Sequence, residues 1–204
     1  MGEAADQLLD FLERAALDGH TVVPVEVAGS ILTSRALRLE EALRELGPDG
    51  RSLVISAEGV LGLRRLVEAE RAVASAVSAR VPGGTVAVVA GPAGSDRDEL
   101  AASLGGPRPA VLDDAERLDV ETVAAFLADA TEDETVVLVG DLDELGSFGP
   151  GRVFADIVDS GLVAMRSVPV APSAVLDHFA AAIRAGELSV PDDPARGVVV
   201  LHVG

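Results

Sequence analysis

The sequence predicts an α/β fold in which helices cover both faces of a parallel sheet. A valine-rich run at residues 85–90 is followed at once by a glycine-containing turn. Continuous apolar runs between helical patterns are typical of parallel sheets, because the crossover helices bury both faces. The expected strands are 85–90, 109–112, 135–140, 162–166 and 197–203, and the expected helices are 96–104, 119–130, 151–160 and 173–186.

The part of the chain before residue 82 has a different pattern. Apolar residues at helical spacing predict helices, and short β-rich runs predict extended pieces. The expected helices are 3–17, 27–34, 38–46 and 64–80, and the extended pieces are 20–24, 51–55 and 59–63. Three helices followed by a small hairpin suggest a winged-helix-like module. We place a junction at Pro82-Gly83-Gly84, which separates a module over residues 1–81 from a domain over residues 84–204.

Composition excludes several classes of protein. The chain has 204 residues, of which 49% are hydrophobic and 2% aromatic, and it has no cysteine. Such hydrophobicity argues against disorder, and so few aromatic side chains provide little for stacking single-stranded bases. Without cysteine there is no disulfide framework and no thiolate site. No apolar run approaches the length of a membrane span, and the acidic N-terminus lacks the basic region of a signal peptide. We therefore expect a cytoplasmic protein with no membrane contact.

The charge of the chain is strongly negative, at −18, with an isoelectric point near 4.3. A polyanionic surface repels nucleic-acid phosphates, so direct nucleic-acid binding is not expected. The charge has two interpretations. It can simply keep the protein soluble, or it can provide an acidic face for a basic partner, including one that normally binds DNA.

The turn after the first strand has the backbone of a phosphate-binding loop. It reads Gly91-Pro92-Ala93-Gly94-Ser95 and leads into a helix, as such loops do. A working P-loop continues with Gly-Lys-Ser/Thr, whereas this chain has Asp96 and Arg97 there and contains no lysine anywhere. The sequence therefore predicts a reduced P-loop NTPase-like sheet whose phosphate-binding chemistry has been lost.

Acidic residues follow two of the later strands. The run at 109–112, expected to be buried, ends in Asp113 and Asp114, and the run at 135–140 is followed by Asp141 and Glu144. An acid at such a position can hold Mg²⁺ and the next can polarise an attacking water. Alternatively, these acids only cap strand ends and helices.

The loop after the strand at 135–140 resembles the first motor domain of RecD-like superfamily 1 DNA helicases. Members carry Gly-Asp-x-x-Gln-Leu-x-Ser-Val-Gly-Pro-Gly at this place. The matching residues are Gly140, Asp141, Leu145, Ser147, Gly149, Pro150 and Gly151. Asp113-Asp114-Ala115-Glu116 is similar to the family's Asp-Glu-Ala-Ser motif, and residues 63–72 look like the small helical domain before the motor. The similarity covers most of residues 10–203 and is firmest over 84–160.

The departures from the family pattern affect the residues that handle ATP. Asp96 and Arg97 stand where the resemblance implies Lys and Ser/Thr, Asp114 replaces a Glu, and Glu144 replaces the Gln that senses the γ-phosphate. The family's Phe-Arg-Gln motif is absent after the strand at 162–166, and the interval that grips single-stranded DNA is short. The second motor domain is expected to be missing as well. We therefore expect no catalysis and no cofactor, and a role as a binding, scaffold or regulatory protein with a protein partner.

Two alternatives stay open at the level of sequence. Asp113, Asp114 and Asp141 could surround a metal in a residual Mg-ATP-binding protein or slow ATPase, or the whole chain could act as an acidic DNA mimic. A further choice concerns Phe148, which stands where the family has Val. It either fills the core, as large apolar side chains usually do, or forms a partner contact together with Arg152.

Overall fold

The computed structural model describes residues 2–46, 53–55, 59–92, 95–104, 106 and 109–168. All of them belong to one compact unit, Met1–Val168. The expected helix 173–186 and strand 197–203 lie outside the described residues, as do Ala93 and Gly94 of the glycine turn.

The first part of the chain folds as a small helical module with an antiparallel sheet. Its elements are α1 (Glu3–Leu17), β1 (Val22–Pro24), α2 (Val25–Thr33), α3 (Leu39–Leu46), β2 (Leu53–Ile55) and β3 (Val60–Leu63). The strand order is β1-β3-β2, so the predicted hairpin gains a third strand from the extended piece after α1. Helix α1 buries the stripe that its sequence predicted, with Leu8 and Leu12 almost fully enclosed.

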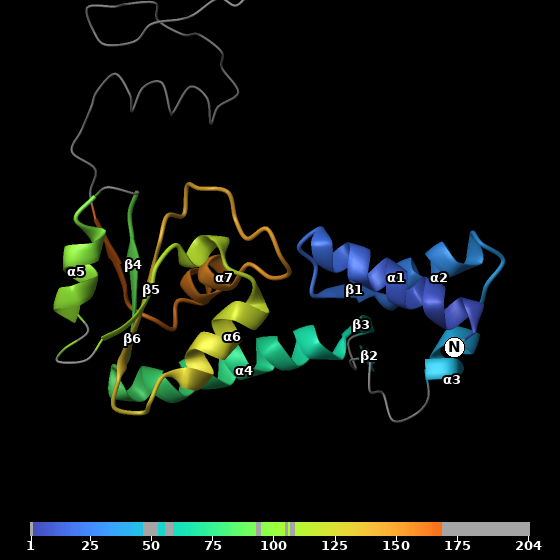
Figure 1. Ribbon diagram of the computed structural model, residues 1–204, viewed down its shortest axis with the longest axis horizontal. Helices are drawn as coiled ribbons and strands as arrows, with labels where there is room; N and C mark the ends of the chain where they lie inside the picture. Colours follow the sequence, from blue (N-terminus) through green and yellow to red (C-terminus); the bar gives the residue numbers. More distant parts are fainter. Residues whose placement is uncertain are drawn as a thin grey trace, which may run out of the picture. The chain divides into compact units, whose positions relative to one another are not determined.

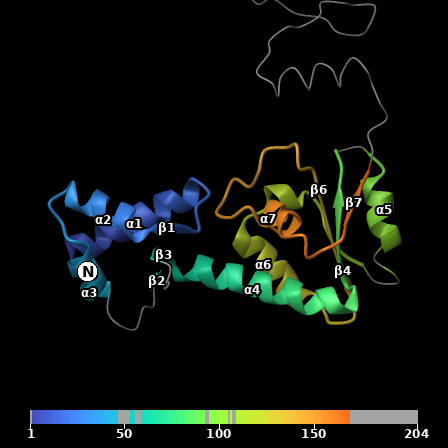
Figure 2. The same ribbon diagram turned by 180° about the vertical axis from the view of Figure 1, so that it is seen from behind.

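Helix α4 (Arg64–Arg80) connects this module to the sheet that follows. It packs along α6 (Val120–Asp129), and both views of the chain show the two helices side by side (Figures 1 and 2). Its buried stripe includes Leu66, Val73 and Val77, as the spacing predicted. The 3₁₀ turn η1 (Val81–Gly83) ends it at the expected junction. Contacts keep residues 1–168 together, so the domain boundary stays a prediction.

The second part of the described chain is a parallel sheet, which confirms the α/β class. Its strands β4 (Val86–Ala90), β5 (Pro109–Leu112), β6 (Thr135–Gly140) and β7 (Met165–Ser167) have the order β5-β6-β4-β7 and run parallel. Helix α5 (Arg97–Leu104) covers one face, and α6 and α7 (Val153–Ser160) lie on the other (Figure 1). The alternating side chains of β6 divide accordingly, because successive residues of a strand face opposite sides.

Two expectations about the strands were wrong in detail. Strand β5 is not buried: Val111 is 42% exposed, because β5 pairs only with β6 and lies at the edge of the described sheet. The strand expected at 162–166 begins later and covers Met165–Ser167. Helix α7 ends at Ser160, and Gly161 takes a positive φ of 65°, so the chain needs several residues to return to the sheet.

Candidate functional site

Gly91, the first residue after β4, lies close to the end of β6 and to Val168, which follows β7. The Gly91 N–H donates to the Gly140 carbonyl at 2.9 Å, and the Ser95 N–H donates to the Pro92 carbonyl at 3.1 Å. A Cβ atom on Gly91 would lie 3.1 Å from both Ser95 Oγ and Val168 Cβ, so glycine permits this close approach. Asp96 is exposed, and its carbonyl accepts from the Leu100 N–H in the first turn of α5.

Arg97 joins this turn to the acidic pair after β5. Its Nη2 atom lies 2.7 Å from Asp114 Oδ1 and 3.1 Å from Asp113 Oδ1, and its Nη1 donates to the Gly91 carbonyl at 3.3 Å. The arginine itself is only 5% exposed. The structure thus brings the glycine turn and the Asp113–Asp114 pair together, and the Arg97 side chain occupies the space between them.

The surroundings of Arg97 hold it in the charged form. Burial lowers its pKa, but the hydrogen bond to Asp114 and the charges of Asp113 and Asp114 outweigh burial and raise the pKa above its ordinary value. Asp114 adopts a left-handed backbone conformation, φ 48°, and its N–H donates to Asp113 Oδ1 at 2.9 Å. Aspartate tolerates this conformation better than most residues. The acidic pair is therefore turned toward a permanent internal cation.

Sequence reasoning did not single out Glu116, which is the most enclosed carboxylate of the described chain. It lies on the 3₁₀ turn η2 (Ala115–Arg117) with a side chain 6% exposed. Its Oε2 accepts from the Asp141 N–H at 3.2 Å, while its buried Oε1 has no hydrogen-bond partner. Burial is the main reason that the pKa of Glu116 is raised. Two backbone N–H groups act in the opposite direction and lower the pKa, while the negative charges of Asp114 and Glu144 raise it further. The only sequence signal was an acid where the helicase family has Ser.

Glu116 reaches the end of β6 because Gly140 has no side chain. A Cβ atom there would lie 2.5 Å from Glu116 Oε2 and 3.0 Å from the Phe154 ring. The Gly140 position that matched the helicase family thus has a packing reason in this structure.

Asp141 and Glu144 belong to this second cluster and not to the one around Arg97. Glu144 is held by the Arg117 guanidinium, and this hydrogen bond and charge raise the pKa of Arg117. Asp141, Glu144 and Glu116 line a pocket of about 110 Å³. Phe154 and Arg152 form other parts of its wall. We call it the Glu116 pocket.

Of the two alternatives for Phe148, the core position is wrong, because this residue is 78% exposed, and the partner contact stays a prediction. The backbone of the Gly149-Pro150-Gly151 segment makes the contacts instead. The Pro150 carbonyl accepts from the Val120 N–H at 2.9 Å, and the Gly151 N–H donates to the Gly19 carbonyl at 3.0 Å. These bonds fix the end of the loop, while the Phe148 side chain remains in solvent. Arg152, its expected companion, is also exposed.

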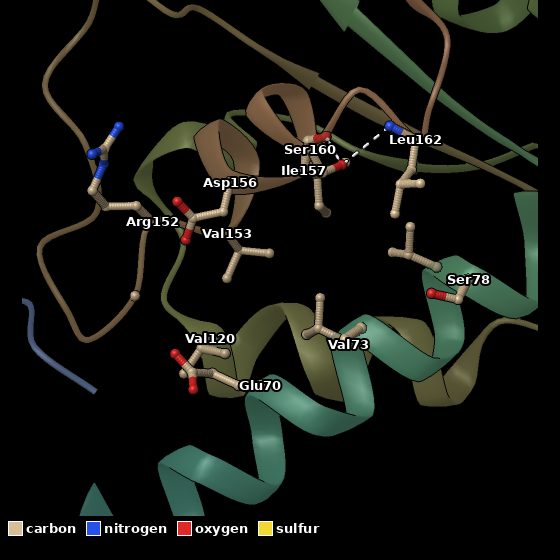
Figure 3. A pocket seen from close by; sticks show the side chains of 13 residues that line it. Glu70, Val73, Ser78, Val120, Arg152, Val153, Asp156, Ile157, Ser160 and Leu162 are labelled. Atoms are coloured by element: carbon tan, nitrogen blue, oxygen red, sulfur yellow. Dashed lines mark hydrogen bonds between the residues drawn. The ribbon is translucent and has the colours of Figure 1, made fainter. Parts of the chain in front are cut away.

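A larger hollow lies elsewhere on the described chain, between α4, α6 and α7, and measures about 260 Å³ (Figure 3). Its walls are mainly valine and isoleucine side chains such as Val73, Val120 and Ile157, and Glu70 and Asp156 lie at its border. Sequence patterns did not reveal it, because most of its residues come from three separate helices.

The described residues include no group of three His, Asp or Glu side chains that could share a metal ion, and none of their helices is long and apolar enough to cross a membrane. No protein-family model matches the chain, and no curated protein matches it significantly.

Proposed function

We propose that this chain is a non-catalytic relative of the RecD-like helicase motor domain and acts by binding another protein. The observation that carries the proposal is the position of Arg97. Its guanidinium bridges the glycine turn and the Asp113–Asp114 pair, where a nucleotide enzyme would place a phosphate and its Mg²⁺.

The arrangement of the described elements supports this ancestry. The order α1-β1-α2-α3-β2-β3 with sheet order β1-β3-β2 fits a winged-helix-like module. The parallel sheet, with a glycine turn between β4 and α5, fits a reduced P-loop-type domain. The contact of Arg97 with the acids after β5 brings the acidic pair to the glycine turn, which supports an origin of both in one nucleotide site.

The electrostatics of the site oppose nucleotide chemistry. Mg²⁺ would need carboxylate oxygens that Arg97 already engages, and removing the arginine from Asp113 and Asp114 would separate a charge-assisted contact. The triphosphate would also approach Asp96, Asp98 and Glu99 at the start of α5, with no lysine available. These acids repel the phosphates that the helix N-terminus would otherwise attract.

An exposed apolar loop supports the second half of the proposal. Leu142, Leu145 and Phe148 are 46%, 80% and 78% exposed, and all three lie in the segment between β6 and α7. This segment follows the carboxyl end of a central strand, where α/β proteins place their binding sites. Exposed apolar side chains gathered in one short segment fit a protein contact surface.

Calorimetric titration with Mg-ATP tests the proposal. We expect no binding heat for the wild-type chain. The double variant Asp96→Lys, Arg97→Thr restores the expected lysine and hydroxyl and removes the internal cation, so gained binding would identify these two residues as the block. Saturable Mg-dependent binding to the wild type, abolished by Asp113→Ala, would instead establish the residual nucleotide-binding function and refute the proposal.

A further inference from the structure

The Glu116 pocket combines enclosed negative charge with an oxygen that lacks a donor. Glu116 Oε1 is buried and accepts no hydrogen bond, and the nearest cationic atom, Arg117 Nε, is 3.7 Å away. A buried carboxylate oxygen without a donor is unfavourable, and proteins normally satisfy such groups. The enclosed Glu116 carboxylate at the wall of this pocket therefore keeps hydrogen-bonding capacity that the described residues do not use.

The charges around the pocket favour a cationic donor. Glu116, Asp141 and Glu144 line it, and Arg117 is already bonded to Glu144. Arg152 is exposed at its edge, where solvent and salt screen its charge more than that of the enclosed Glu116. The Phe154 ring forms another part of the wall.

The size and surroundings of the pocket indicate what carries the cation. A volume of about 110 Å³ is well below that of sites for drug-sized ligands and suits the end of one side chain. The described residues offer no grouping for a metal ion. The exposed Leu142, Leu145 and Phe148 on the same loop would stay uncovered by a free ion or amine, whereas a polypeptide could cover them.

We propose that the Glu116 pocket receives the cationic end of a lysine or arginine side chain from a partner protein, which pairs with the Glu116 carboxylate while adjacent apolar residues of that partner cover the loop. This inference rests on the proposed protein-binding function. It names the partner's chemistry as a basic residue flanked by apolar ones.

Titration with capped amino acids, followed by the Asp141 amide signal in ¹H–¹⁵N NMR spectra of the full chain, tests this assignment. The Asp141 N–H donates to Glu116 and thus reports on the pocket directly. The probes are Nα-acetyl-arginine amide and Nα-acetyl-lysine amide, and the control is Nα-acetyl-citrulline amide, which is uncharged but similar in shape to arginine. We expect saturable shifts with a Kd of about 1–10 mM for at least one cationic probe, and binding at least about tenfold weaker for citrulline.

Two variants complete the experiment. Glu116→Gln keeps the shape and removes the charge, so it should weaken binding of the cationic probe about tenfold or more. Glu132→Gln makes the same change at an exposed residue before β6, at the opposite end of that strand, and should leave binding unchanged. No saturable shift on the wild type, or equal binding of citrulline, would overturn the inference without any reliance on a variant's folding. If no cationic probe binds and Mg-ATP does not bind either, only this inference is refuted. If Mg-ATP binds to the wild type, the proposed function is refuted.

Discussion

Replacing Phe148 by alanine should barely change stability, whereas the same replacement at Phe154 should be severe. The two residues lie in the same segment of the chain but are 78% and 2% exposed. Full burial of a phenylalanine contributes about 1.5–3 kcal/mol, and roughly a fifth of the Phe148 surface is covered. Phe148→Ala should therefore cost roughly 0.3–0.6 kcal/mol.

Phe154→Ala is the matched control, because it removes the same atoms from an enclosed position. Its cost should be about 3–5 kcal/mol, including the cavity left beside Gly140. For a chain of this length, about 1 kcal/mol shifts the melting temperature by roughly 2–4 °C. We therefore expect the melting temperature to fall by roughly 6–20 °C for Phe154→Ala and by less than about 3 °C for Phe148→Ala.

Thermal unfolding followed by circular dichroism measures both variants under identical conditions. A Phe148→Ala variant that loses as much stability as Phe154→Ala would show that Phe148 is packed in solution. Phe148 would then not be available to contact another protein, and a protein contact at this loop would be refuted.

The other predictions concern the polar contacts around Arg97 and around Glu116, and the charge of the chain. Arg97→Met should lower stability by roughly 1–3 kcal/mol, since the Gly91 carbonyl and two half-exposed acids lose their donor. Urea unfolding measures this loss. The control variant Arg166→Met, on the exposed strand β7, should be nearly neutral. Gly140→Ala should cost roughly 1–3 kcal/mol through its clash with Glu116 and Phe154, and a stable variant would contradict the close approach. The raised pKa of Glu116 means that the folded chain binds the Glu116 proton more tightly than the unfolded chain does. The stability of the wild type relative to Glu116→Gln should therefore fall as the pH rises from the ordinary glutamate pKa of 4.5 through the raised pKa of the folded chain. A difference between the two unfolding free energies that does not change with pH would be evidence against this. Single-stranded DNA should not bind in about 150 mM salt, because a charge of −18 repels phosphates, and micromolar binding by fluorescence anisotropy would show otherwise.

Local patterns in the sequence determined where the elements lie. The apolar stripe of α1 and the valine runs of β4 and β6 each have a single favourable periodicity, so helix and parallel strand could be predicted without knowledge of their neighbours. The glycine turn and the acidic pair were also visible, because each is continuous along the chain. The expected helix at 173–186 lies outside the described residues and remains a prediction.

Tertiary structure decided what those motifs do. Arg97 looked like a lost hydroxyl in the sequence, but folding brings it to Asp113 and Asp114 and makes it the internal cation of the site. Glu116 gave almost no signal, because its burial depends on Gly140 and Phe154 from distant segments. Phe148 is exposed because the backbone around Pro150, and not its own side chain, makes the loop's contacts. Periodicity is a property of neighbours along the chain, whereas burial and ion pairing depend on neighbours in space, which only the folded structure provides.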